Sequence, residues 1–167
     1  MQNRGVIVRL EWQEALAASQ AGLYRTLYAL YKCNGHKYGL ARGEQDLGRD
    51  VRSTLAELAV AKYLGVFWSG LAKDCKDTTL CEVRSTPKPD NPLVIRDSDS
   101  PDDIFVLVTT EQIPALRLVG WIRARDGMLD SYVKAPCGRP PAYFIPQSAL
   151  HPMEDLRQQS RRNYVEM

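Results

Sequence analysis

The sequence predicts an α/β protein of one domain, in which helices come first and a sheet follows. In the first 64 residues, two long segments carry apolar residues at helical spacing. After Gly65 the pattern changes to short runs rich in β-branched and aromatic residues, separated by turn-forming Pro, Asp and Ser. A length of 167 residues suits a single domain, so we expect one unit over 1–167, with a helical part at about 11–64 and a sheet-rich part at about 66–146.

Two helices are expected in the helical part. The first spans about 11–32, and a row of leucines along it is expected to be its core face, with a tyrosine stripe at the margin of that face and base stacking as the alternative for the tyrosines. The second begins near Asp50, a good N-cap, and ends at Gly65. It is apolar on nearly all sides and is therefore expected to be buried. The leucines are Leu16, Leu23, Leu27 and Leu30, and the tyrosines are Tyr24, Tyr28 and Tyr31.

The strand-like runs after Gly65 are expected to form one sheet. They lie, in chain order, at 66–68, 79–85, 93–96, 104–110 and 116–123, and another short strand-like run, 6–10, precedes the first helix. The segment 85–103 is rich in Pro, Asp and Ser, which predicts turns with solvated acidic side chains. The segment 135–146 is expected to be irregular, and the polar tail 153–162 is expected to form a short helix.

Composition excludes several classes of protein. A net charge of +2 gives no global basic footprint for nucleic acid, and this balance neither suggests nor excludes DNA. The four cysteines have no zinc-ligand spacing, and no phosphate-binding glycine loop is present. No segment is apolar and long enough for a membrane span, so we expect a cytosolic protein with reduced thiols. His36 and His151 are expected at the surface, and the cysteines are Cys33, Cys75, Cys81 and Cys137.

Acidic side chains stand where an ordinary core would not place them. Glu57 lies inside the apolar second helix, where a carboxylate is costly unless it is paired or binds a metal. In the strand around residue 82, the period of two sends Glu82 and Arg84 to one face. Asp77 and Asp74 precede this strand closely enough for either to reach Glu82. Carboxylates that hold a divalent cation, beside a cation that holds phosphate, are the groups needed for phosphodiester hydrolysis.

The order of these residues resembles the PD-(D/E)XK nuclease superfamily, over about residues 50–123. Through the segments 59–65, 105–109 and 119–122, the chain is also similar to small nuclease-like proteins carried by bacteriophages. The resemblance implies a restriction-endonuclease-like core, in which a helix leads into a mixed sheet flanked by helices. It implies that Glu57 is the helix glutamate, Asp77, in preference to Asp74, the motif aspartate, and Glu82 the strand acid. Arg84 stands at the position of the motif lysine.

The resemblance further implies a DNA nuclease in which Asp77, Glu82 and Glu57 hold Mg²⁺, with Mn²⁺ as an alternative ion, in the cytoplasm of a bacterial host. Two positions depart from the motif, because arginine replaces the lysine and Lys76 replaces the proline before the aspartate. Arginine holds phosphate but does not act as a base, so Arg84 is expected to stabilise the phosphate.

Two alternatives stay open. The first is a catalytically inactive nuclease-fold protein that binds DNA or a protein partner, which the arginine replacement favours. The second is a purely structural arrangement, in which Glu82 and Arg84 belong to a cross-strand ion-pairing face, Asp74 and Asp77 are turn residues, and Glu57 is bonded to backbone donors. The sequence leaves the oligomeric state open.

Overall fold

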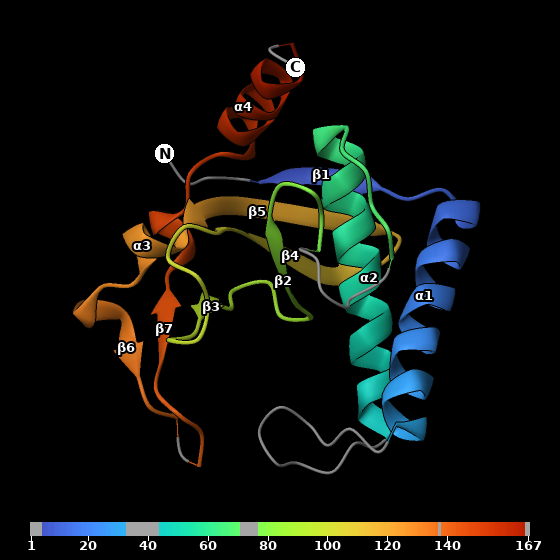
Figure 1. Cartoon of the computed structure of the whole chain (residues 1–167), viewed down its shortest axis with the longest axis horizontal. Helices are drawn as coiled ribbons and strands as arrows, with labels where there is room; N and C mark the ends of the chain where they lie inside the picture. The colour runs from blue at the N-terminus through green and yellow to red at the C-terminus, as the bar shows by residue number, and fades with distance from the viewer. Residues whose placement is uncertain (1–4, 33–43, 71–76, 137, 166–167) are drawn as a thin grey trace.

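Helices and two sheets make up the computed structural model, which describes residues 5–32, 44–70, 77–136 and 138–165 (Figure 1). This mixture confirms the predicted α/β class, and the N-terminal helix is present. The main elements are β1 (Val6–Arg9), α1 (Trp12–Tyr31), α2 (Glu44–Leu64), β2 (Glu82–Thr86), β3 (Leu93–Ile95), β4 (Ile104–Gln112), β5 (Ala115–Arg123), α3 (Ala124–Gly127), β6 (Val133–Lys134), β7 (Ala142–Ile145) and α4 (Met153–Val165). The short helix expected at 153–162 is thus confirmed as α4.

The strands form two sheets, so the expectation of one sheet was wrong. Sheet A has the order β1-β5-β4-β2 and is mixed, since β2 runs parallel to β4 and the other pairs are antiparallel. Sheet B has the order β3-β7-β6 and is antiparallel. Its central strand β7 comes from the proline-rich 135–146 segment, so the expectation of irregular chain was wrong for residues 142–145, where Ala142 and Ile145 supply two buried apolar side chains. The expected strand at 66–68 is absent, because that segment packs as irregular chain beside α1 and α2.

The two faces of sheet A bury different cores. The strand register pairs Val83 with Val106, and both lie in a core that α2 covers. The opposite face carries Phe105 and Leu107, which pack with residues of sheet B such as Ile145 in a second core. Figure 1 shows α1 and α2 side by side at one end of the molecule and sheet B at the other. Strands β4 and β5 therefore contribute side chains to both cores.

The helix pair α1 and α2 packs through small residues, not through the leucine row. Gly22 lies so close to α2 that a β-carbon there would come within 2.6 Å of the Val51 Cα. The buried residues of α1 are Ala18, Gly22, Thr26 and Ala29. The leucine row was predicted to be the core face, and this prediction was wrong, since its four leucines are 42–50% exposed. Small side chains allow closer helix contact than leucines, and they occupy the face toward α2.

The second helix begins earlier than predicted, at Glu44 and not near Asp50. Asp50 lies inside α2, and its carboxylate accepts a hydrogen bond from the Thr26 hydroxyl at 2.8 Å. The residue has the chemistry of a cap but makes a contact between helices instead. The buried character predicted for the later part of α2 is confirmed, as Ala56, Ala59 and Val60 are fully buried.

Within the described residues, no helix is long and apolar enough to cross a membrane. Several residues singled out in the sequence lie outside that part of the chain: His36, Asp74, Cys33, Cys75 and Cys137. Cys81 is described, and its buried thiol contacts the Thr78 hydroxyl at 3.4 Å.

Candidate functional site

The strand acid and its neighbouring cation lie on an edge strand of sheet A. In β2, Glu82 pairs with Phe105 of β4 and Arg84 pairs with Leu107, so both point to the face opposite α2. Val83 points the other way, into the core beneath α2. The alternation inferred from the sequence is confirmed.

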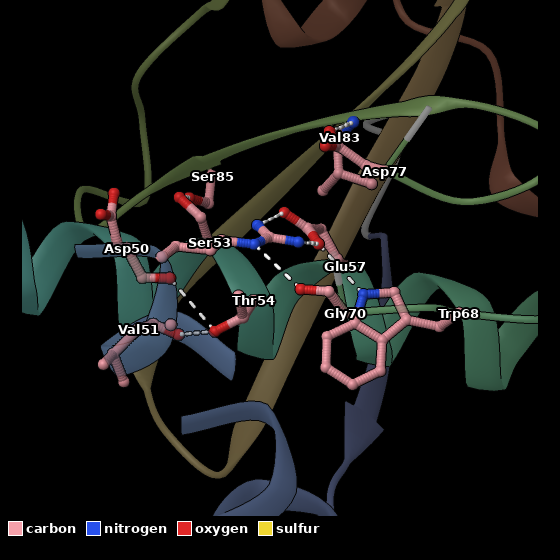
Figure 2. A network of polar contacts seen from close by, with 12 residues as sticks. Asp50, Val51, Ser53, Thr54, Glu57, Trp68, Gly70, Asp77, Val83 and Ser85 are labelled. Atoms are coloured by element: carbon pink, nitrogen blue, oxygen red, sulfur yellow. Dashed lines mark hydrogen bonds and ion pairs between the residues drawn. The ribbon is translucent and has the colours of Figure 1, made fainter. Parts of the chain in front are cut away.

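A short turn positions Asp77 at the start of this strand. One Asp77 oxygen accepts a hydrogen bond of 2.7 Å from the Val83 backbone amide (Figure 2). The buried Thr78 hydroxyl accepts hydrogen bonds from the amides of Leu80 and Cys81, which holds the turn together. Asp77 therefore lies beside the free edge of β2, between the two faces of the sheet.

Glu57 accepts hydrogen bonds from two side chains on the face of the sheet that α2 covers. Its two oxygens accept hydrogen bonds from Arg25 at 2.6 and 2.7 Å, and one also accepts a hydrogen bond from the Trp68 indole at 3.0 Å (Figure 2). Arg25 donates in addition to the Gly70 carbonyl at 3.1 Å. The pair is mostly buried, with side chains 14% and 4% exposed. Glu57 is thus a satisfied, buried partner of an arginine.

The protonation of this pair follows from burial and charge. Burial raises the pKa of Glu57 above its usual value; the hydrogen bonds from Arg25 oppose this rise, and the nearby Asp77 charge adds to it. Burial by itself would lower the pKa of Arg25, but the hydrogen bond and charge of Glu57 outweigh it and the pKa is raised. Arg25 therefore stays charged and compensates the carboxylate.

Glu82 lies in an electrostatic environment that disfavours its charged form. Half-burial raises the pKa of Glu82 to about 7, and the negative charge of Asp77 contributes next. Arg84 opposes the rise, while Asp103 and Asp99 add to it. The negative charges near Glu82 thus outweigh the positive charge of Arg84.

Arg84 is held by two contacts and keeps one donor free. It donates to an Asp99 oxygen at 3.0 Å, and its guanidinium carbon lies 4.8 Å from the centre of the Phe105 ring. The same Asp99 oxygen accepts the Arg96 amide at 2.9 Å, which fixes the loop against β2. The Arg84 Nε is buried and has no hydrogen-bond partner in the described chain. A buried free donor is costly, and an acceptor placed there would satisfy it.

The three predicted carboxylates do not converge into one group of ligands. Glu57 lies on the α2 face and Glu82 on the opposite face, with Asp77 at the edge as the carboxylate whose charge acts on both. Within the described residues, no group of three or more His, Cys, Asp or Glu side chains is placed to hold a metal ion. What the structure brings together is Asp77, Glu82 and Arg84 at β2.

The structural alternative inferred from the sequence has different partners in the structure. Arg84 pairs with Asp99, not across a strand, and Glu57 is bonded to the side chains of Arg25 and Trp68, not to backbone donors. Asp77 does bind a backbone amide, as a turn residue would. Side chains from distant segments thus replace the local partners that the alternative assumed.

Sequence reasoning missed Arg25, Trp68 and Asp99. Arg25 carried a usable signal, since it falls on the small-residue face of α1 beside Gly22, where a charge needs a partner. Asp99 was expected to be solvated with the rest of its acidic loop, and this was wrong, because its side chain is only 12% exposed. Nothing local distinguishes Asp99 from its neighbours; only the packing of the loop on β2 does.

The fold and site define an α/β protein with an acidic pair and an arginine on an edge strand. Comparisons with protein-family models, with curated proteins and with solved structures find no match for this chain.

Proposed function

We propose that this protein is a metal-dependent nuclease of the PD-(D/E)XK type, which hydrolyses phosphodiester bonds of DNA in the cytoplasm of a bacterial host. The observation that carries the proposal is the pair Asp77 and Glu82 at β2, where the pKa of Glu82 is raised to about 7 beside a second carboxylate. Perturbed acids in close groups occur often at functional sites, and a bound cation relieves their mutual repulsion.

The donor set fits Mg²⁺, with Mn²⁺ as an alternative ion. Both carboxylates supply hard oxygen ligands, and Mg²⁺ is commonly held by one or two carboxylates while water and substrate phosphates complete its coordination. Asp77 and Glu82 would be those two. Such an ion, when bound, lowers the pKa of a coordinated water and neutralises charge on the phosphate.

Arg84 has the chemistry to bind a phosphate next to this pair. Its guanidinium is fixed by Asp99 and Phe105, while its buried Nε still lacks an acceptor. The Arg84 side chain is 25% exposed, so a phosphate would meet the exposed part of the guanidinium and not the buried Nε, and arginine pairs well with phosphate. Since arginine does not give up its proton, Arg84 orients and stabilises rather than acting as a base.

Glu57 has a supporting role in this proposal. Both of its oxygens are engaged by Arg25, so a direct ligand role for Glu57 would require this ion pair to open. As it stands, the pair orders the segment around Trp68 and Gly70 that leads toward the Asp77 turn.

Incubation of plasmid DNA with the protein and Mg²⁺ or Mn²⁺, beside an EDTA control, tests the proposal. We expect EDTA-sensitive nicking or digestion, and its loss in Asp77→Asn and Glu82→Gln. Glu111→Gln, an exposed acid at the end of β4, is the matched control and should cleave like the parent. Failure to cleave linear, circular or single-stranded DNA with either metal would rule out the nuclease.

A second candidate is a nuclease-fold protein that binds DNA or a protein without cleaving. Its supporting observation is that Arg84, at the motif lysine position, is tied into an ion pair with Asp99. A DNA mobility shift that persists with EDTA, without cleavage and without change in Glu82→Gln, would support this second candidate over the first.

A further inference from the structure

The three nitrogens of the Arg84 guanidinium have different surroundings. Nη2 donates a hydrogen bond to the Asp99 carboxylate at 3.0 Å. In the described part of the chain, Nε is the one buried side-chain nitrogen or oxygen that lacks a partner. Nη1 has no partner among the described residues either, so it must reach solvent, in keeping with a side chain that is 25% exposed. A phosphate can therefore approach Arg84 from the side of Nη1.

One oxygen of Asp99 joins Arg84 to the loop that follows β3. The Asp99 Oδ2 accepts the Arg84 Nη2 at 3.0 Å and the Arg96 backbone amide at 2.9 Å. The Asp99 amide donates in return to the Arg96 carbonyl at 3.0 Å, which closes a turn. The Asp99 side chain is only 12% exposed, and a charge-assisted hydrogen bond away from water is strong and well oriented. Two donors thus fix the carboxylate that holds Arg84.

The loop that carries Asp99 is fixed at both of its ends. It begins at the end of β3, which pairs with β7 in sheet B. Near its other end, the Asp103 carbonyl accepts the Ala124 amide at 2.8 Å. The Pro101 carbonyl accepts the Arg125 amide at 2.9 Å. Since these bonds tie the loop to α3, Asp99 is in position before any substrate binds.

Phe105 supports the flat side of the same guanidinium. The guanidinium carbon of Arg84 lies 4.8 Å from the centre of the Phe105 ring, and this ring is almost fully buried. A ring can fix the plane of a guanidinium but leaves its rotation within that plane open. A hydrogen bond at one edge removes that freedom. Asp99 is therefore the contact that decides which nitrogen of Arg84 faces outward.

We propose that Asp99 is a positioning residue for DNA cleavage, which holds Arg84 by Nη2 so that Nη1 meets the phosphate under attack. The inference rests on the proposed function and adds to it a residue from outside β2. Without Asp99, Arg84 keeps its charge, but its long side chain is free to turn. A charge that moves still attracts DNA, whereas a fixed charge is also oriented for the transition state. Loss of Asp99 therefore lowers kcat more than it weakens DNA binding.

Rates of plasmid cleavage with Mg²⁺, measured over a range of plasmid concentrations, test the inference through kcat and KM. We expect Asp99→Ala to lower kcat roughly 10- to 100-fold, with a KM no higher than that of the parent. Asp99→Asn keeps an oxygen that can accept both donors, so its kcat should stay close to that of the parent. Asp97→Asn, at an exposed acid of the same loop, removes the same charge and is the matched control that should cleave like the parent. Thermal melts check that each variant is folded.

The outcomes distinguish this inference from the proposed function. If the parent cleaves and Asp99→Ala has the same kcat, or only a higher KM, the inference is overturned and the nuclease stands. A folded Asp99→Asn protein as slow as Asp99→Ala would also overturn it, because the charge of Asp99 and not its hydrogen bonds would then matter. If Asp99→Ala does not fold, Asp99→Ser replaces it, since a serine can still cap the turn but is shorter than the aspartate that reaches Arg84. A parent that cleaves no DNA with either metal would overturn the proposed function and this inference together.

Discussion

Glu82 lies half-buried on an edge strand, where the surrounding carboxylates outnumber the single nearby guanidinium. Burial is the main reason that its pKa is raised to about 7, and Asp77 is the next cause. When a carboxylate with a raised pKa is charged, its place in the folded protein lowers the free energy of unfolding. This effect makes the residue sensitive both to pH and to cations.

The pH dependence of stability follows with a definite sign. Unfolded Glu82 loses its proton near the usual value of 4.5, but folded Glu82 keeps it until about pH 7. Between these values the folded state binds more protons, so the free energy of unfolding falls as pH rises. We predict that Glu82→Gln melts at a higher temperature than the parent at pH 8, and that the difference shrinks at pH 4, in metal-free thermal melts.

The same variant should respond less to metal. Mg²⁺ raises the melting temperature of the parent at pH 8 if Glu82 is a ligand, and the apparent affinity should drop at least roughly tenfold in Glu82→Gln. An equal Mg²⁺ titration in both proteins would remove Glu82 from the ligand set.

Arg84 is the second residue whose substitution distinguishes a role in cleavage from a purely structural role. We predict that Arg84→Ala abolishes cleavage, because the variant removes the cation beside the acidic pair. Arg84→Lys should still cleave, since lysine also carries a positive charge and is the residue that the motif has at this position. Plasmid cleavage rates at pH 8 measure both. If Arg84→Ala cleaves as fast as the parent, Arg84 acts only as a partner of Asp99 and Phe105.

At the scale of elements, α1 and α2 are joined by small residues and by one buried ion pair. Arg25 reaches from α1 across to Glu57 on α2 and to the Gly70 carbonyl. A single charge reversed or removed here would leave its partner buried without compensation. The pair therefore specifies how the two helices meet.

We predict that Arg25→Met lowers the free energy of unfolding by about 3 to 5 kcal/mol, because the Glu57 charge remains buried. The double variant Arg25→Met/Glu57→Leu should recover most of that loss, since it removes both charges. Urea denaturation at pH 7 measures the three proteins. A double variant no more stable than Arg25→Met would mean that packing, and not charge, causes the loss.

At the scale of the whole molecule, the two cores share strands β4 and β5. Val106 and Leu118 face one core, while Phe105 and Val119 face the other. Helix α4 closes the first core with Met153 and Leu156, which are almost fully buried. Loss of either sheet face would expose the shared strands.

We predict a single unfolding transition for this reason. Tryptophan fluorescence reports the first core through Trp121 and through Trp68, which packs against it, while Trp12 is exposed. Hydrogen exchange at the Ile95 and Ile145 amides reports on sheet B beside the second core. The two measurements should give the same unfolding free energy in urea. A lower value for sheet B would show that it opens separately.

Local residue patterns were enough to predict much of this protein. The extent of α1 came from the helical spacing of its apolar residues, and the positions of β4 and β5 came from runs of β-branched and aromatic residues. The helix α4 was expected from a polar tail that follows the proline-rich segment. The common face of Glu82 and Arg84 followed from the same local rule. The anomaly of Glu57 was visible because a charge within an apolar helix needs a partner whatever the fold.

Tertiary packing decided what those patterns could not. The leucine row and the small-residue face of α1 are both apolar stripes, and only the close contact at Gly22 shows which one meets α2. The partner of Glu57 proved to be Arg25, 32 residues away in sequence, and the partner of Arg84 proved to be Asp99 from a loop that looked solvated. The sequence determined that charges had to be compensated, because burial cost depends on residue type. Which charges compensate one another depends on distances in space, so only the folded chain decided it.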